Sequence, residues 1–365
     1  MSKEALSDKQ GIAIISLFII GSSIILTTAG EAKKDIWIAI ILSIIAAIPV
    51  LLVHSRLLVL FPGKDLYDIL EIIFGKVVGK GISILFIWFS FFLGGLVLKV
   101  FGDFILMVSM PETPEIVSMF MIGVLCIWAV KEGIGTIGRW AEFFIIGTIA
   151  LILLVSLMLI HRMNINNLRP MLSINIKPTI EGAFHAFIFP FTQTIVFTTF
   201  FSSSKIKSLY KVYIFGVLIG GIVLYISATT DILVLGVNII GGMHFPSFGT
   251  ARLLEFAEIW EGVEILITTS FIVGGFIKVS ICLLSTCNGV AKIFEFEEYK
   301  SIVTPIGFLV VNLSYFIHDS VMEKSEFALN IYPIYAFPFQ VILPLIILII
   351  AEIKKKHLKN RIMEK

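Results

Sequence analysis

The stretch TIEGAFHAFIFPFTQTIVFTTFF, residues 179–201, is typical of a membrane span, but a proline interrupts it at FPF, residues 189–191. A second apolar stretch, GIAIISLFIIGSSIILTTA at residues 11–29, is interrupted in the same way by GSS at residues 21–23. Inside a bilayer every backbone N–H and C=O needs a partner, so a broken helix is tolerated only where it faces protein or a watery cavity. Breaks at corresponding places in two halves of a chain indicate a transporter-type binding site.

The composition indicates a polytopic membrane protein. Of the 365 residues, 58% are hydrophobic and only 15% are charged, and the mean hydropathy is +1.00. This leaves too little polar surface for a water-soluble globule. The protein is therefore predicted to lie in a lipid bilayer and not to bind nucleic acid. The three cysteines all lie in apolar stretches, which favours packing roles over a disulfide framework or a metal cluster. The first apolar run is predicted to be a membrane helix and not a cleaved signal peptide.

We predict an all-α fold with ten transmembrane helices in a single integral membrane domain, residues 1–365. Each predicted span is an apolar stretch near the roughly 20 residues that a helix needs to cross the hydrocarbon. The spans are residues 11–29, 35–60, 82–108, 114–130, 140–160, 179–201, 212–237, 262–284, 302–317 and 331–353. The first five form one repeat, residues 11–160, and the last five form a second, residues 179–353.

The placement of basic residues predicts the orientation. With ten spans and a cytoplasmic N-terminus, most of the 28 lysine and arginine residues lie in cytoplasmic segments, so both termini are predicted to be cytoplasmic. Five spans per half start the second repeat on the opposite side, so the two repeats are inverted and their broken first helices face each other. A double glycine before a lysine occurs in residues 94–99 and again in residues 274–278, either as an internal echo or as a coincidence of the biased composition.

Several motifs of the chain resemble those of a known family. They are FPGKDL at residues 61–66, FGKVVGK at residues 74–80, GIGTIGRWAE at residues 133–142 and the FPF break. In their order and spacing they resemble the B subunits of spore germination receptors, which belong to the amino acid, polyamine and organocation transporter superfamily. The resemblance covers essentially the whole chain and implies a LeuT-like fold of five plus five inverted helices.

The resemblance also implies a function, a location and partners. It implies a subunit of a nutrient germinant receptor in the spore inner membrane, with both termini on the spore core side. The implied partners are a larger A-type membrane subunit, a C-type lipoprotein and a small nutrient ligand. In the wider superfamily the unwound stretches of the first and sixth helices hold the substrate. Many superfamily members have a fuller glycine-rich turn where this chain has Ser22 and Ser23, which leaves open how far the first helix unwinds.

Elementary chemistry favours a polar ligand at the breaks. Pro190 has no amide donor and disrupts the preceding turn, which frees backbone groups near the middle of the bilayer. Freed carbonyls can bind a ligand ammonium, and N–H groups at the start of a half-helix can bind its carboxylate. The predicted ligand is a small nutrient, an amino acid; the alternative is a simple proline kink with small-residue packing. The predicted ligand-binding residues are Gly21, Ser22, Ser23, Phe189, Pro190, Phe191, Thr192 and Gln193.

Ionisable residues inside the spans are candidates for coupling or gating. Lys99 and Asp103 stand four apart and can pair on one helix face, although Lys99 can also snorkel to the interface. Lys278 has no acidic residue one turn away, so its ammonium either takes the place of a coupling cation or snorkels. Asp231 is a candidate proton-coupling carboxylate or a hydrogen-bonded packing residue.

Two further acidic features lie on the predicted outer side. Glu181 and His185, four residues apart before the sixth break, are predicted to gate the site or to sense pH, with a satisfied interface histidine as the alternative. An acidic row is either a solvated helix face or a surface for the lipoprotein partner. It consists of Glu255, Glu258, Glu261 and Glu264.

The sequence predicts no enzymatic activity and no cofactor. Its six histidines are dispersed without metal-ligand spacing, and neither a Walker motif nor a dinucleotide motif is present. The predicted function is that of a B subunit that binds a nutrient at the midplane of a transporter-like bundle and triggers germination. The alternative is a proton-coupled amino acid transporter with the same site and a complete transport cycle.

Overall fold

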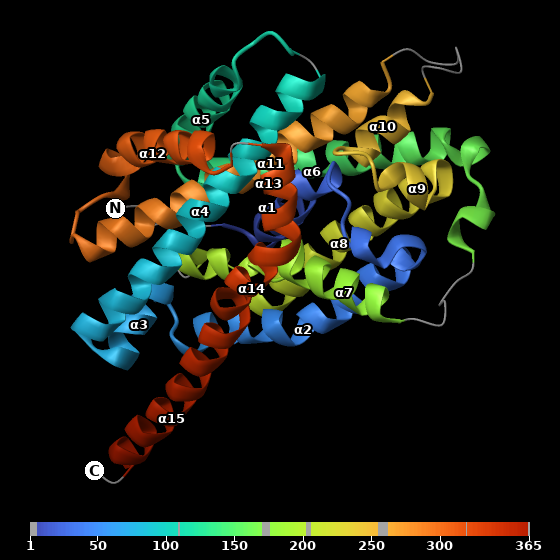
Figure 1. Cartoon of the computed structure of the whole chain (residues 1–365). Coiled ribbons are helices and arrows are strands. Elements are labelled where there is room, and N and C mark those ends of the chain that lie inside the picture. Colours follow the sequence, from blue (N-terminus) through green and yellow to red (C-terminus); the bar gives the residue numbers. More distant parts are fainter. Residues whose placement is uncertain are drawn as a thin grey trace.

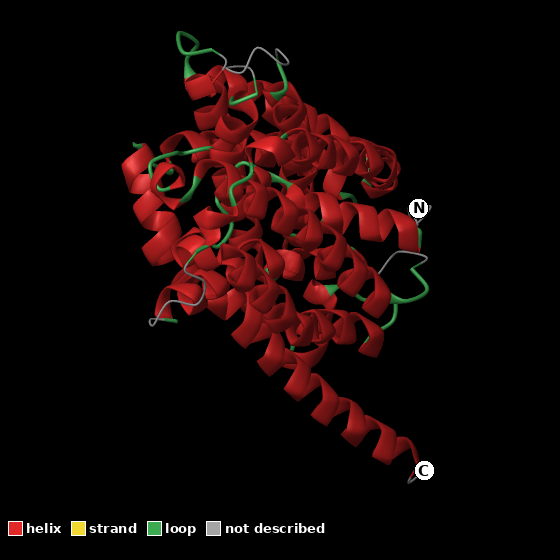
Figure 2. Cartoon of the chain, turned by 90° about the vertical axis from the view of Figure 1, so that its right-hand side faces the viewer, coloured by secondary structure: helices red, strands yellow, loops and turns green. Residues whose placement is uncertain are grey.

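The structure is a computed structural model. It describes residues 6–108, 110–169, 176–201, 206–254, 262–318 and 320–363. In these ranges all regular secondary structure is helical and no β-strand occurs (Figures 1 and 2). The predicted acidic row lies outside the described residues except for Glu264, the first residue of a long helix.

The described chain consists of α-helices (α) and of short 3-10 or π-helical segments (η). In chain order they are α1 (Asp8–Ile20), η1 (Ser22–Ile24), η2 (Gly30–Asp35), α2 (Ile36–Leu60), α3 (Leu66–Phe74), α4 (Lys76–Val108), α5 (Glu115–Glu132), α6 (Ile134–Met158), η3 (Ile160–Arg162), η4 (Ile165–Leu168), α7 (Lys177–Ala186), η5 (Phe187–Phe191), η6 (Gln193–Thr199), α8 (Leu209–Leu235), α9 (Val237–Ile240), α10 (Pro246–Arg252), α11 (Glu264–Ile293), η9 (Tyr299–Ile302), α12 (Val303–Phe316), α13 (Val321–Glu326), η10 (Phe327–Ile331), α14 (Tyr332–Phe337), η11 (Pro338–Ile342) and α15 (Leu343–Met363).

Seven helical stretches among the described residues are long and apolar enough to cross a membrane. They are Gly30–Leu60, Lys76–Val108, Ile134–Met158, Lys177–Thr199, Leu209–Leu235, Glu264–Ile293 and Met322–Lys354. The other three predicted spans contain α1 and α12, which have only 13 and 14 residues, and α5, whose ends carry three charged residues. The all-helical membrane architecture is therefore confirmed, and the count of ten spans stays a prediction.

Glycines allow α11 to pass against elements of the other half of the chain. A Cβ atom on Gly274 of α11 would lie only 2.9 Å from the Cα atom of Gly21, so backbone meets backbone at the end of α1. At the next residue, a Cβ atom on Gly275 would lie 2.4 Å from the Phe101 ring of α4. The two double glycines of the sequence thus belong to helices that pack together, since α4 and α11 are neighbours along the bundle.

Ion pairs close one end of the bundle, which we call the inner clasp. Lys292, near the end of α11, pairs with Asp68 of α3. Its Nζ atom also lies 2.6 Å from Oδ2 of Asp65, the residue just before α3. Glu295 accepts from Lys76 and Lys80, at 2.8 and 3.1 Å. These two hydrogen bonds lower the pKa of the exposed Glu295 carboxyl to about 2. The clasp joins elements of the two predicted repeats.

The outer surface of the bundle suits a lipid environment. Large apolar side chains are exposed along single helices, for example Phe143 and Ile146 of α6, at 76% and 74%. Such a continuous apolar surface is unfavourable in water but matches hydrocarbon. The last helix, α15, extends beyond the rest of the bundle in both views (Figures 1 and 2).

Candidate functional site

The first break lies where the sequence predicts it. α1 ends at Gly21, whose amide donates to the Leu17 carbonyl, and a single 3-10 turn follows from Ser22 to Ile24. Both serines are buried, and their hydroxyls have no hydrogen-bond partner in the described part of the chain. The first helix thus ends in a short stretch whose polar groups remain available.

The second break is wider than the sequence alone indicates. After α7, the backbone leaves the helical conformation at Phe189, with φ −132° and ψ 106°, and the Phe189–Pro190 peptide bond is cis. The chain then continues to Thr199 as a 3-10 helix and not as an α-helix. The predicted interruption at residues 189–191 is confirmed, and its irregular geometry extends through most of the second half of the predicted span.

Side chains around the second break are bonded to other helices. Thr192 Oγ1 donates to the Phe187 carbonyl, 2.9 Å away, and lies 2.6 Å from Gln340 Oε1. Gln193 Nε2 donates to the hydroxyl of Tyr332, at 2.6 Å, in α14. The second break is therefore held in place by the last membrane stretch of the chain.

His54 of α2 was not singled out from the sequence, yet it supports the second break. Its Nδ1 lies 3.0 Å from Thr194 Oγ1, and its Nε2 lies 2.9 Å from the Gln340 carbonyl oxygen. The residue is completely buried. A histidine in a mostly apolar helix was the available signal, but its partners are far away in the sequence.

Lys278 connects the two breaks. Its side chain is 0% exposed, so the predicted snorkelling alternative is wrong. The Nζ atom lies 4.3 Å from the centre of the Phe189 ring and 5.0 Å from that of Phe18, near the end of α1. Within the described residues, Nζ has neither a hydrogen-bond acceptor nor a carboxylate partner. The Lys278 amine thus lies between both broken helices, against two aromatic rings.

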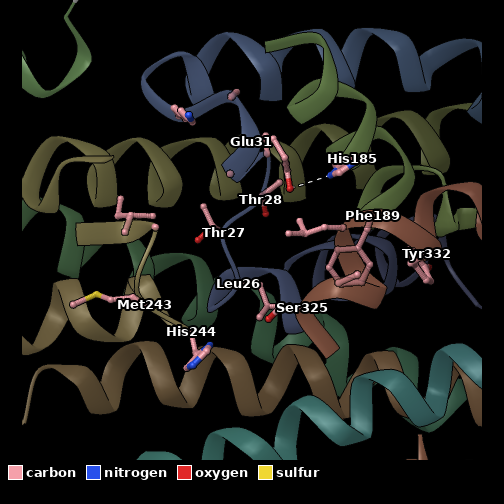
Figure 3. Close-up of a pocket in the computed structure, with 18 of the residues that line it drawn as sticks. Leu26, Thr27, Thr28, Glu31, His185, Phe189, Met243, His244, Ser325 and Tyr332 are labelled. Carbon is pink, nitrogen blue, oxygen red and sulfur yellow. Dashed lines mark ion pairs between the residues drawn. The ribbon is translucent and has the colours of Figure 1, made fainter. Parts of the chain in front are cut away.

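A cavity of about 900 Å³ leads from the surface to both breaks (Figure 3). Its lining includes Ser22 at the first break, Phe189 at the second and Tyr332 beside it. The rings of Phe189 and Tyr332 meet edge to face with centroids 5.9 Å apart. The cavity lies at the start of α2, whereas the inner clasp lies beyond its end, so the two features occupy opposite ends of the bundle.

An ion pair spans the cavity wall. His185 Nδ1 lies 3.0 Å from Glu31 Oε1, as the dashed line in Figure 3 shows. Glu181 instead pairs with Lys177, at 3.6 Å. The sequence correctly places His185 beside the site, but its carboxylate partner is Glu31 and not Glu181. Glu31 was missed because it lies beyond the first span, far from His185 in the chain.

The predicted Lys99–Asp103 pair belongs to a larger buried group of charges. Lys99 Nζ lies 3.8 Å from Asp103 Oδ1 and 2.8 Å from Glu115 Oε2 of α5. Asp103 also pairs with Lys324 of α13, which lines the cavity. Lys99 is only 7% exposed, so it does not snorkel. The pairing is confirmed, and Glu115 and Lys324 are the residues that sequence reasoning missed.

Asp231 is a buried carboxylate next to the first break. It accepts a hydrogen bond from Ser247 Oγ of α10, at 2.5 Å. Together with Ser23 and Thr28 it also surrounds a small gap that is too narrow to hold a water molecule. The hydrogen bond matches the predicted packing role, and a coupling role stays a prediction.

Histidine, cysteine and acidic side chains do not gather into a metal-binding group anywhere in the described ranges. The polar residues that do converge are those of the two breaks, together with Lys278. They suit the binding of a small polar molecule through hydrogen bonds and charge.

Two broken helices that face a common cavity define a class of helical membrane proteins with the fold of transporters. Mhp1, a nucleobase-cation-symport-1 family transporter solved in a closed conformation with bromovinylhydantoin, has a TM-score of 0.67 at 13% identity, over 94% of this chain and 77% of Mhp1. MhsT, solved in complex with L-phenylalanine, has a TM-score of 0.66 at 12% identity, over 93% of this chain and 87% of MhsT. At these identities the likeness shows the fold alone, and it supports the predicted LeuT-like fold.

Within this class the chain belongs to the spore germination protein family, also called spore permeases, whose family model matches residues 5–321. Spore germination protein KB of Bacillus subtilis is 26% identical over 365 residues, covering 98% of this chain and 97% of that protein. Spore germination protein YndE of the same organism is 26% identical over 275 residues, covering 73% and 74%. The resemblance drawn from the sequence motifs is thus confirmed.

Proposed function

We propose that this chain is the nutrient-binding B subunit of a germinant receptor. It binds a small nutrient, an amino acid, between the two broken helices, and binding triggers spore germination. The observation that carries the proposal is the cavity that ends at Ser22 and Phe189, beside buried polar atoms that have no partner among the described residues. Its volume of about 900 Å³ falls in the range of about 300–1,000 Å³ of ordinary ligand pockets.

The proposed signal is a shift between conformations. In this structure the cavity is open at one end and ion pairs close the other end. A ligand shifts such an equilibrium only if it binds one conformation more tightly than the other. An amino acid that contacts both broken helices favours the conformation in which the two breaks lie close together.

The proposal includes a topology, a location and partners. Ten spans in two inverted repeats, residues 11–160 and 179–353, place both termini in the spore core. The named spore germination proteins among the relatives support a spore inner membrane location. The proposed partners are an A-type membrane subunit and a C-type lipoprotein.

A second candidate is a proton-coupled amino acid transporter. The fold shared with Mhp1 and MhsT favours it, as does the buried carboxylate of Asp231 beside the first break. Saturable, proton-driven uptake of a labelled amino acid by proteoliposomes that contain this chain alone would replace the sensory proposal with transport.

The proposed function is tested by germination. Spores that lack this chain are compared with the parent strain on a panel of amino acids, sugars and nucleosides, and loss of the response to an amino acid is the expected result. Complementation with the natural chain restores that response, whereas complementation with Gly21→Leu does not. A deletion strain that responds to every nutrient like its parent contradicts the proposal.

A further inference from the structure

The side chain of Lys278 lacks the partner that a buried ammonium needs. Taking an ammonium out of water is costly unless an anion or several acceptors compensate its charge. None of the described carboxylates pairs with Lys278, and its Nζ has no acceptor in that part of the chain. Two ring faces and the carbonyl end of α1 offer partial compensation only. The site therefore holds one buried amine whose charged form lacks a compensating anion.

The surroundings of this charge are those of the proposed ligand site. A Cβ atom on Gly21 would lie 3.0 Å from Lys278 Cδ, so the lysine stem runs directly past the first break. The hydroxyls of Ser22 and Ser23 and the side-chain amide oxygen Oε1 of Gln193 are also buried without partners among the described residues. α11 contacts the segments that carry all three, η1 and η6. The buried polar atoms without partners thus belong to segments that contact α11, the helix that carries Lys278.

The ring of Phe189 separates Lys278 from the cavity. The Phe189 ring lines the cavity (Figure 3), whereas Lys278 does not. The centre of this ring is 4.3 Å from Lys278 Nζ. Phe189 belongs to the irregular segment of the second break, where the backbone is not held in a regular helix. Rotation of this one ring would connect the ammonium with the cavity.

We propose that Lys278 is the anion-binding residue of the site and that the ligand is a small molecule with a carboxylate, which reaches Lys278 when the Phe189 ring moves aside. The inference rests on the proposed function and names the chemical class of its ligand. A carboxylate fits better than a phosphate because one ammonium balances one negative charge, and a dianion would leave excess charge buried. A charge-assisted hydrogen bond to Lys278 also makes the carboxylate the recognised group.

The test uses the full chain in lipid nanodiscs and measures ligand-induced thermal stabilisation. Each common L-amino acid is compared with its own C-terminal carboxamide, which removes the negative charge and keeps the side chain. We expect the natural chain to bind at least one acid at least about tenfold more tightly than its amide. We expect Lys278→Met to bind acid and amide equally, whereas Lys131→Met, at an exposed position in α5, retains the natural preference.

Three results would overturn the inference. The first is equal binding of acid and amide by the natural chain, a result that does not depend on any variant folding. The second is an undiminished preference for the acid in Lys278→Met. The third is that the natural chain binds neither acids nor amides. If sugars or nucleosides bind in that last case and Gly21→Leu blocks them, a nutrient site exists without carboxylate recognition. If no compound of any class binds, the proposed function fails as well.

Discussion

The two broken helices differ in how their polar groups are satisfied. At the second break, Thr192 and Gln193 are bonded to the last membrane stretch, and His54 supports the segment from α2. At the first break, the hydroxyls of Ser22 and Ser23 have no partner among the described residues. The difference teaches that the second break is tied to the scaffold, although Gln193 Oε1 has no partner among the described residues, while the first break keeps both serine hydroxyls free for a ligand.

The largest effect is expected from closing the first break. In Gly21→Leu the new side chain would start 2.9 Å from the Phe18 carbonyl and 3.0 Å from Lys278 Cδ, so the backbone must shift. We expect the nutrient response of spores and the binding of ligand in nanodiscs to be lost. Gly147→Leu in α6 is the matched control, because a Cβ atom there meets nothing within 4 Å. A normal response in Gly21→Leu spores would show that the first break does not form the site.

A large loss of stability is expected from the support of the second break. His54→Ala leaves Thr194 Oγ1 and the Gln340 carbonyl without their buried partner. We expect the free energy of unfolding to fall by about 1–3 kcal/mol, measured by thermal or detergent unfolding. His161→Ala, at an exposed position in η3, serves as the control and should unfold like the natural chain. Equal stability of both variants would mean that the second break is not held from α2.

The contrast is sharpened by removing a hydroxyl from each break. Ser22→Ala removes an unpartnered hydroxyl, so we expect stability within about 0.5 kcal/mol of the natural chain but roughly tenfold weaker nutrient binding. Thr192→Val removes a bonded hydroxyl, so we expect a loss of about 1 kcal/mol in stability. Titration of ligand and thermal unfolding of both variants measure the two quantities. The contrast would fail if Ser22→Ala lost as much stability as Thr192→Val.

The smallest effect is expected far from both breaks, at the inner clasp. Because Lys76 and Lys80 lower the Glu295 pKa to about 2, below the unfolded value near 4.3, this carboxylate stabilises the fold above about pH 4.3. The stabilisation is lost as the pH falls from 4.3 towards 2. Between pH 6 and pH 3 the melting temperature should therefore fall slightly less in Glu295→Gln than in the natural chain. Identical declines would mean that this exposed ion pair contributes nothing measurable.

The positions of both breaks could be predicted from the sequence because their causes are local. Pro190 cannot continue a helix, and GSS at residues 21–23 has weak helix propensity. The residues that complete the site could not be predicted in the same way. Glu31 reaches His185, and His54 reaches Gln340, through the packing of helices that are distant in the chain.

The burial of Lys278 was equally hard to predict. Hydropathy shows that a residue lies in a span but not whether it faces lipid, protein or cavity. For Lys278 the deciding factor is the glycine at position 274, which brings α11 against the end of α1. The 3-10 conformation of Gln193–Thr199 likewise has no local sequence signal that we can identify.

The backbone contact between Gly21 and Gly274 has a mechanical consequence. No flexible side chain separates the end of α1 from α11 at that point, so the contact can serve as a pivot. From Gly274, α11 continues for 18 residues to Lys292, a length of about 27 Å at 1.5 Å per residue. A tilt of about 10° at the pivot would move the far end of this rod by roughly 5 Å, enough to separate Lys292 from Asp65. A small rearrangement at the nutrient site can thus be amplified into a broken ion pair at the opposite end of the molecule.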